Sequence, residues 1–254
     1  MHPLLDQLGR APSLDGIKRA LFVQPHPDDN QVAAAGLIAK LVSQGTEVYE
    51  LTVCDDHKVD LGYSGEGLTT RQKEAVAAQE CLGMKNAGFL GFADKTRASV
   101  DEISVKIVEV IRKIQPDALF TCDPSLITEC HSDHIKTGEA VKYAAEDASC
   151  AFYPTLIDGQ LREDSWDIDM LGFYYTDKAN TYIDITESFE KKAESIRCHA
   201  SQGAPMLVMS TQALDGVAGE HIGCEYAEAY RVISRLHMHC FNHEVLPYKE
   251  DDDD

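Results

Sequence analysis

Histidine and aspartate occur together in two short stretches of the chain. Residues 25–29 read PHPDD and residues 131–134 read HSDH, and each stretch follows a short apolar run. Neutral imidazole and carboxylate are ligands for Zn²⁺ and related divalent ions. A site with three such protein ligands keeps positions open for water and substrate, which is typical of catalytic metal centres. A water ionised near neutral pH in such a site can hydrolyse an unreactive amide or ester.

The first stretch also has a plain structural interpretation. A helix is expected directly after it, and Asp29 or Asn30 would serve as its cap. Against this, the adjacent charges of Asp28 and Asp29 are costly if they are buried without a cation. His26 lies three residues before Asp29, so the two side chains can converge on one ion in a tight turn. Because a second cluster of His and Asp follows another apolar run, we favour the metal site.

Strands and helices alternate along the first 150 residues and must position these two stretches. Short apolar runs alternate with segments whose apolar residues recur every three or four positions. Strands are expected at 19–25, 47–53, 87–92 and 117–122, and helices at 31–44, 70–82, 100–114 and 135–147. This order predicts a parallel sheet covered by helices on both faces. Ligands of such sheets bind beyond the carboxyl ends of the strands, where both His-Asp stretches fall.

The pattern is less regular after about residue 150. Strands are expected at 171–176, 181–185 and 228–233, and a helix at 187–201. We interpret residues 1–248 as a single domain, and residues 249–254 (KEDDDD) as a disordered or artificial acidic tail. The pocket walls are expected from residues 55–68 and from the irregular segment 180–223. Phe173, Tyr174 and Tyr175 are expected in the core or in a pocket wall.

Composition excludes several classes of function. The chain has 23 Lys and Arg against 43 Asp and Glu, a net charge of −20 at pH 7, which argues against nucleic acid or an anionic membrane as partner. There is no apolar run of 18 residues, so no membrane insertion is expected, and the first residues lack the pattern of a signal peptide. The eight cysteines form no C-x-x-C pair, which favours reduced thiols in a cytoplasmic protein.

Three competing interpretations are weaker. A nucleotide-binding domain needs a glycine-rich first turn, whereas residues 25–29 are proline-rich and anionic. A serine hydrolase of the α/β type needs the motif G-x-S-x-G, which the chain lacks. His237, His239 and His243 form a rival metal cluster, since alternating residues of a strand share one face. No carboxylate at a strand end accompanies these three histidines.

Several motifs together resemble one family. The HPDD stretch after the first strand and the H-x-D-H stretch after a later strand resemble the PIG-L/LmbE-like zinc deacetylases. The resemblance extends over most of the chain, through R-x-x-E-A at 71–75, L-G-F-x-D at 90–94, H-x-S-Q at 199–202 and E-x-Y-R-V at 228–232. It implies an α/β, Rossmann-like three-layer αβα fold with a mostly parallel sheet and a less regular C-terminal part. It also implies removal of an N-acetyl group from an N-acetylglucosamine-containing small molecule.

The resemblance implies roles for the residues of the two stretches. His26, Asp29 and His134 would bind Zn²⁺, and Fe²⁺ or another divalent ion suits the same ligands. Asp28 would be the general base that takes a proton from the attacking water. His131 would stabilise the oxyanion or protonate the leaving amine.

The remaining roles implied by the resemblance concern positioning and the substrate. Asp133 would orient a histidine from behind the metal ligands. Arg71 and Asp94 would bind sugar hydroxyls. Arg71 could instead pair with Glu74 on the same helix, and Asp94 could be an ordinary turn residue.

Two positions depart from the family pattern. Asn30 stands where the family usually has Glu; we place it with the substrate-binding residues and expect it to support the loop or cap the following helix. Glu129 stands where several members have a Tyr, and it is a conceivable extra acid.

We therefore expect a metal-dependent N-deacetylase of an N-acetylglucosamine-type molecule or conjugate. The alternatives are a non-catalytic homologue that binds metal or sugar, and a hydrolase of another amide. The sequence leaves the oligomeric state open, a homo-oligomer included.

Overall fold

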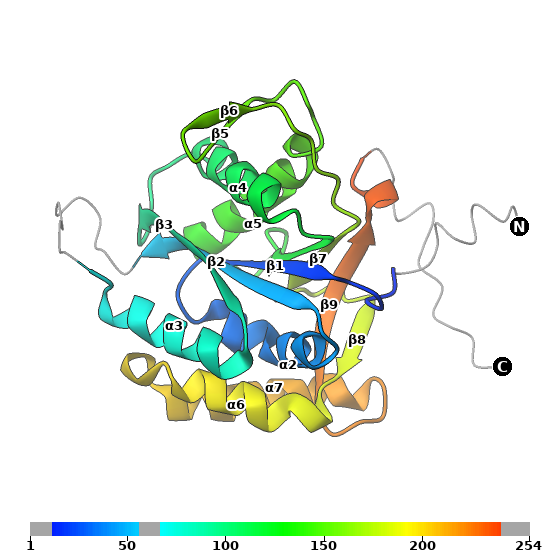
Figure 1. Cartoon of the computed structure of the whole chain (residues 1–254). Helices are drawn as coiled ribbons and strands as arrows, with labels where there is room; N and C mark the ends of the chain where they lie inside the picture. The colour runs from blue at the N-terminus through cyan, green and yellow to red at the C-terminus, as the bar shows by residue number, and fades with distance from the viewer. Residues whose placement is uncertain (1–11, 56–66, 240–254) are drawn as a thin grey trace, which may run out of the picture.

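A seven-stranded sheet forms the centre of the computed structural model, which describes residues 12–55 and 67–239 (Figure 1). The strands lie in the order β3–β2–β1–β4–β7–β9–β8. Their bounds are Arg19–Gln24 (β1), Glu47–Asp55 (β2), Lys85–Ala93 (β3), Ala118–Cys122 (β4), Met170–Tyr174 (β7), Thr181–Asp184 (β8) and Ala227–Ser234 (β9). A separate hairpin consists of β5 (Thr155–Ile157) and β6 (Gln160–Arg162).

The sheet is mostly parallel, as the sequence predicts. β1 pairs in parallel with β2 and β4, β3 extends the sheet beyond β2, and β7 extends it beyond β4. Only β9 runs against its neighbours β7 and β8. Every residue of β4 is buried, as expected for a parallel strand that is covered on both faces.

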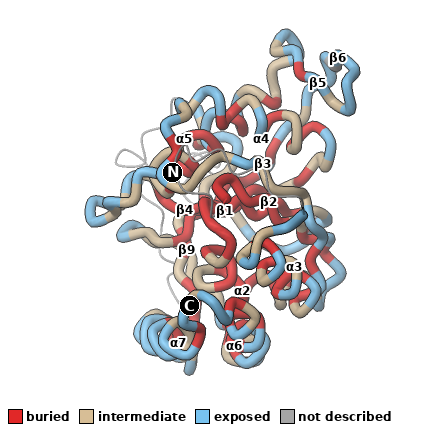
Figure 2. Tube along the Cα trace, turned by 90° about the vertical axis from the view of Figure 1, so that its left-hand side faces the viewer, coloured by how far each residue is buried: buried red, intermediate tan, exposed pale blue. Residues whose placement is uncertain are grey.

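Helices cover both faces of the sheet and give the predicted three layers. One face carries α2 (Asp29–Ser43), α3 (Thr70–Leu82), α6 (Phe189–Arg197) and α7 (Ala204–Glu220), and the other carries α4 (Val100–Ile114) and α5 (Ser132–Asp147) (Figure 1). Buried residues concentrate in the strands, while the outer sides of α6 and α7 are exposed (Figure 2). No helix within the described ranges is long and apolar enough to cross a bilayer.

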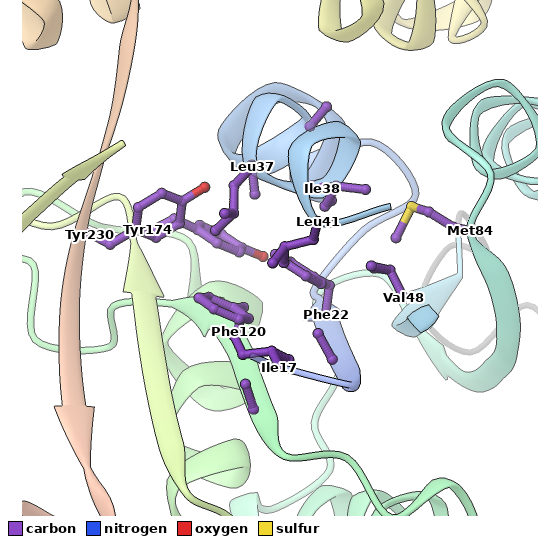
Figure 3. Packing of buried hydrophobic residues seen from close by; sticks show 14 of the residues in the cluster. Ile17, Phe22, Leu37, Ile38, Leu41, Val48, Met84, Phe120, Tyr174 and Tyr230 are labelled. Carbon is purple, nitrogen blue, oxygen red and sulfur yellow. The ribbon is translucent and has the colours of Figure 1, made fainter. Parts of the chain in front are cut away.

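Apolar side chains fill the space between the sheet and α2. The rings of Phe22 and Phe120 stack with centroids 4.5 Å apart, and Leu37 and Ile38 of α2 belong to the same buried cluster (Figure 3). Burying each of these side chains stabilises the fold by about 1.5–3 kcal/mol. Gly172 of β7 leaves room for this stack, because a Cβ there would lie 2.4 Å from the Phe120 ring. Close packing therefore fixes the adjacent strands β1, β4 and β7.

The structure shifts some predicted boundaries and adds a helix. Helix α5 begins at Ser132 instead of residue 135, and the helix predicted at 187–201 ends at Arg197. The segment 180–223 is not irregular, because it contains α7. The helix was not predicted because the four consecutive apolar residues 206–209 do not have the spacing of an amphipathic helix. Residues 56–66 of the predicted wall loop and the predicted tail lie outside the described residues.

A buried ion cluster ties α6 and β9 to α2. Nζ of Lys192 lies 2.7 Å from Oε1 of Glu228 and 2.8 Å from Oδ2 of Asp215. The Glu228 carboxylate also accepts the backbone N–H groups of Gly36 and Leu37, both at 2.8 Å. Buried charges are costly unless they are paired and hydrogen-bonded, and here both conditions hold. Glu228, the first residue of the E-x-Y-R-V motif, therefore holds the middle of α2 and is itself paired with Lys192.

A second buried network holds the start of α2. Glu50 of β2 is fully buried and accepts hydrogen bonds from the side chains of Asn30 (3.1 Å), Gln31 (2.8 Å) and Gln79 (2.8 Å). Burial raises the pKa of Glu50, although these three donors act in the opposite direction. The carboxyl group of Glu50 thus joins β2, α2 and α3 directly beneath the turn that follows β1.

Asn30 occupies the centre of this network. Its N–H donates to Oε1 of Gln24 at 2.9 Å, and its side-chain oxygen accepts the hydroxyl of Tyr174 at 3.1 Å. No part of Asn30 is exposed. A glutamate at this position, as in the family pattern, would face the buried carboxyl group of Glu50. The side-chain amide of asparagine instead donates a hydrogen bond to the carboxyl group of Glu50.

Asn30→Asp is expected to lower the free energy of unfolding by about 2–4 kcal/mol, because it replaces a donor to Glu50 with a second buried carboxylate. Denaturant unfolding measures this loss. Asn86→Asp is the matched control, since Asn86 is exposed on β3 and its Oδ1, which accepts the Gly88 N–H at 2.7 Å, is retained. Equal destabilisation by the two substitutions would contradict the role given to Asn30.

Candidate active site

The two His-Asp stretches meet at the carboxyl ends of β1 and β4. These strands are parallel neighbours, so the loops that follow them leave the same edge of the sheet. The ring centroids of His26 and His131 are 4.7 Å apart, those of His26 and His134 5.3 Å, and those of His131 and His134 5.1 Å. The structure thus brings together side chains more than 100 residues apart in sequence.

Asp29 lies between two of these histidines. Its Oδ2 is 3.3 Å from Nδ1 of His26, and its Oδ1 is 3.5 Å from Nε2 of His134. The backbone N–H of His26 donates to Oδ2 at 2.9 Å and fixes the carboxylate. Two ligands of a tetrahedral zinc ion, with bonds of about 2.0–2.1 Å, are about 3.4 Å apart. Each of these two contacts has the separation of two ligands of one ion, although they involve different oxygens of Asp29.

The other ring nitrogen of His26 faces a second set of acids. Nε2 lies 3.2 Å from Oδ2 of Asp133 and 3.5 Å from Oδ1 of Asp94. Within the described parts of the chain, potential ligand atoms gather in two groups, His26 with His131 and His134, and His26 with Asp94, His131 and Asp133. His26 and His131 are therefore the two residues that both groups share, and Asp29 belongs to neither group.

Asp133 is completely buried in the first turn of α5. Besides contacting His26, it accepts the backbone N–H of Lys95 at 2.6 Å. Burial acts to raise the pKa of Asp133, but the hydrogen bonds from His26 and Lys95 outweigh it, so the pKa falls below its usual value. Asp133 is thus a carboxylate that holds a proton on Nε2 of His26. Nδ1 of His26 is left to face Asp29.

The site has an excess of negative charge that a cation would relieve. Burial acts to lower the pKa of His26, but hydrogen bonds to Asp133 and Asp29 outweigh burial and raise it to about 10. The pKa of Asp29 falls although burial opposes this, because of its hydrogen bond to His26 and the charge of His134. Without a metal, protonated His26 supplies the positive charge among the carboxylates. A divalent ion would supply the same compensation, so the residues present fit a metal.

Asp28 belongs to neither ligand group and pairs with Arg71 instead. Nη2 of Arg71 lies 2.9 Å from Oδ1 of Asp28. Glu74, the alternative partner of Arg71 in the sequence, bonds to the backbone and hydroxyl of Ser201. Burial and the charge of Asp29 raise the pKa of Asp28 to about 6, against the opposing effect of Arg71. A carboxyl group in this range can exchange protons near neutral pH.

Glu129 contacts both histidines of the second stretch. Its Oε2 lies 2.9 Å from Nδ1 of His134, an ion-pair distance without an aligned hydrogen bond. Its Oε1 accepts the backbone N–H of His131 at 2.6 Å. A carboxylate beside Nδ1 leaves Nε2 of His134 to face Asp29. From the sequence we expected Glu129 only as an extra acid. The spacing E-x-H-x-x-H was the feature that could have predicted its contacts with both histidines.

His131 caps α5 and remains partly exposed beside Asp94. Its Nδ1 accepts the backbone N–H of Asp133 at 3.4 Å, and its Nε2 lies 4.0 Å from Oδ1 of Asp94. Burial and the positive charges of His26 and His134 lower the pKa of His131. The ring is therefore neutral at pH 7 and carries its proton on Nε2.

The predicted substrate residues divide into two kinds. Asp94, with 39% of its side chain exposed, borders the histidines, and Arg71 reaches the site through Asp28. Asn30 is not placed to contact a substrate, but it supports the loop as we also expected. It is fully buried beneath the turn, where its bonds to Glu50 and Tyr174 support the loop.

The rival histidine cluster near the C-terminus is not assembled among the described residues. His237 bonds through Nδ1 to the hydroxyl of Ser234 at 2.7 Å. The ligand groups found in residues 12–55 and 67–239 include neither His237 nor His239, and His243 lies outside these ranges.

Tyr175 borders the site from the end of β7. Its φ of 53° is in the left-handed region, which is uncommon for a residue other than glycine. The ring is parallel to that of His134, with centroids 6.3 Å apart, and the hydroxyl donates to the backbone carbonyl of Asp29 at 3.4 Å. Strained backbone that the surroundings maintain is frequent at functional sites. No pattern in the sequence distinguishes Tyr175 from its buried neighbour Tyr174.

Known proteins share this site region and the fold. The family model of GlcNAc-PI de-N-acetylase (PIG-L) matches residues 21–145, which contain both His-Asp stretches. The diacetylchitobiose deacetylase of Thermococcus kodakarensis is 32% identical over 238 residues, 88% of this chain and 86% of that protein. The 1D-myo-inositol 2-acetamido-2-deoxy-alpha-D-glucopyranoside deacetylase of Rhodococcus erythropolis is 31% identical over 54% of this chain and 56% of its own length.

A solved structure extends the similarity to the whole architecture. The N,N'-diacetylchitobiose deacetylase of Pyrococcus horikoshii, in complex with its inhibitor, superposes with a TM-score of 0.75 at 28% identity, over 91% of this chain and 89% of that one. The family resemblance expected from the sequence is thereby confirmed. By these matches and the motifs within them, the chain belongs to the PIG-L family, that of GlcNAc-PI de-N-acetylase.

Proposed function

We propose that this protein is a metal-dependent N-deacetylase of an N-acetylglucosamine-type small molecule or conjugate. The observation that carries the proposal is the convergence of His26, His131 and His134 at ligand spacing. Asp29, which neither ligand group includes, contacts His26 and His134, and Asp28 is its neighbour in the chain. The relatives named above, which act on diacetylchitobiose and on a GlcNAc-inositol, support the substrate class. Zn²⁺ is the proposed ion, and Fe²⁺ suits the same ligands.

Nδ1 of His26, the carboxylate of Asp29 and Nε2 of His134 would hold the ion. When bound, it would lower the pKa of a water to about 7 and polarise the amide carbonyl. Asp133 keeps the proton of His26 on Nε2, and Glu129 holds the ring of His134 from its Nδ1 side. These two acids fix which nitrogen of each ring is presented to the ion.

Asp28 is proposed as the general base. Arg71 holds its Oδ1, so Oδ2 is the oxygen available to take a proton from the attacking water. The same proton can then pass to the amine nitrogen as the C–N bond breaks, which yields acetate and the free amine. Neutral His131 is suited to donate its Nε2–H to the oxyanion rather than to protonate the amine, because its pKa is lowered. Arg71 and Asp94 are proposed to contact sugar hydroxyls.

Substitution of the adjacent aspartates separates proton transfer from metal binding. Asp28→Asn is expected to lower kcat by about 10²–10⁴-fold while the chain retains its metal, because only the base is lost. Asp29→Asn, the matched neighbour, is expected to lose metal and activity together. Acetate release from N-acetyl sugars and their conjugates, with elemental analysis of each purified variant, measures both effects.

Clear outcomes would refute this proposal. If the purified chain holds no stoichiometric metal and takes up none on reconstitution, a metal-dependent reaction is excluded. If Asp28→Asn is as active as the unsubstituted protein, Asp28 is not the base. Metal and sugar binding without acetate release from any substrate would identify a non-catalytic homologue, and release from unrelated amides alone would identify another hydrolase.

Metal binding is expected to release a proton at pH 7. The pKa of His26 without metal is raised to about 10, so the ring carries an extra proton at pH 7 that must leave before Nδ1 can bind an ion. The apparent affinity for Zn²⁺ should therefore rise about tenfold per pH unit between pH 7 and 9. Calorimetry in buffers of different ionisation enthalpy measures the proton directly.

Asp133→Asn is the control for this experiment, because it removes the carboxylate that contributes most to the raised pKa of His26. This variant should release a smaller fraction of a proton. An affinity independent of pH in both proteins would show that His26 is not the group displaced.

A further inference from the structure

The geometry points to an acyl-binding hollow, and we propose that the enzyme cleaves N-acyl groups longer than acetyl. The inference rests on the proposed function and concerns the acyl half of the same amide. A hollow of about 510 Å³ opens beside the histidine cluster and is lined by Leu126, Thr128, Glu129, His134, Tyr175 and Thr176. The hollow is an open depression, and its volume is sufficient for a short acyl chain that lies along its wall. An acetyl group ends in a single methyl and would leave most of the hollow empty.

The hollow lies on the opposite side of the site from the proposed sugar contacts. Asp94 and Asp29 face opposite nitrogens of the His26 ring, at 3.5 Å from Nε2 and 3.3 Å from Nδ1. His134 follows beyond Asp29, and its ring faces that of Tyr175. The order along this edge is thus Asp94, His26, Asp29, His134 and Tyr175.

The sheet topology gives the same order independently. Asp94 follows β3 and Arg71 follows β2, whereas Tyr175 follows β7. In the sheet, β1 and β4 lie between β2 and β7. An amide whose sugar contacts Arg71 and Asp94 would have its acyl carbon near the histidines. The acyl chain would then extend toward β7 and into the hollow.

The lining suits an apolar chain. Leu126 and the ring of Tyr175 supply apolar surface, and the two threonines add methyl groups. The lining has no Lys or Arg, its histidine is the proposed metal ligand His134, and Glu129 adds a negative charge, so the hollow is unsuited to a carboxylate or a phosphate. A short aliphatic acyl group matches these walls. Each methylene buried against them would raise kcat/KM by up to about fourfold.

One carboxylate fixes both walls of the hollow. Oδ1 of Asp123 accepts the N–H (2.8 Å) and hydroxyl (2.6 Å) of Ser125 in the loop that carries Leu126. Its Oδ2 accepts the hydroxyl of Thr176 at 2.6 Å, directly after Tyr175. The hollow is therefore built into the fold before any ligand arrives, and the left-handed conformation of Tyr175 is part of its construction.

A series of N-acetyl, N-propionyl and N-butanoyl glucosamine tests the inference. The expected result is that the longer amides are cleaved with kcat/KM equal to or above that of the acetyl amide. Thr128→Phe should fill the hollow, lower cleavage of the propionyl and butanoyl amides at least tenfold, and leave acetyl cleavage within twofold. Leu126→Trp is a second filling variant. Ile127→Phe is the matched control, since Ile127 is in the same loop, is 86% exposed and does not line the hollow.

The outcomes separate this inference from the proposed function. Acetyl cleavage with rejection of the longer amides by more than tenfold overturns the inference and leaves the deacetylase intact. If Thr128→Phe impairs cleavage of N,N'-diacetylchitobiose but not of the butanoyl amide, the hollow holds a second sugar and the inference is wrong. If no amide is cleaved, the proposed function fails. Calorimetric binding of the acetyl and butanoyl amides to the metal-loaded protein and to Thr128→Phe then decides whether the hollow takes an acyl chain.

Discussion

Repulsion among carboxylates is the constraint on which this site depends. Five acids surround the three histidines at one edge of the sheet, and four of them accept a hydrogen bond from a partner of their own, whereas Asp94 is partly exposed. Asp29 accepts the backbone N–H of His26, Asp133 accepts that of Lys95, and Glu129 accepts that of His131. Arg71 binds Asp28, and Nε2 of His26 faces Asp94. Because these acids cannot move apart, positive charge at the centre of the cluster is favoured. A proton on His26 and a divalent ion are two ways of supplying it.

The positions of Asp28 and Asp29 depend on α2, which two buried networks hold. Glu50 fixes the first turn of α2 through Asn30 and Gln31, and Glu228 fixes its middle through two backbone N–H groups. Both carboxyl groups are fully bonded, so burial costs less than it would for an isolated charge. The turn that carries His26 thus has little freedom. Catalytic groups require such support, because small displacements of their atoms slow a reaction severely.

Most of the fold and the convergence of the two stretches could be predicted from the sequence, because both depend on local patterns. Alternating strands and helices predict a parallel sheet, and both stretches follow strands, so they were expected at one edge. Contacts between distant segments were not readable in the same way. The burial of Asn30 depends on Glu50, and the place of Tyr175 beside His134 depends on β7 being the neighbour of β4. Helix α7 was missed because its exposed apolar residues obscure the helical period.

The position of Asp123 has a consequence for how substrate range can diverge within such a fold. Asp123 joins the loop after β4 to the end of β7 eight residues before His131. Residues 125–128, which supply Leu126 and Thr128 to the hollow, therefore have a support of their own, whereas Glu129 and His134 belong to both the hollow and the histidine cluster. Insertions or substitutions between Ser125 and Thr128 can reshape this wall of the hollow without displacing the histidines. Selection on the acyl group and selection on the chemistry of hydrolysis can therefore act on separate stretches of a single loop.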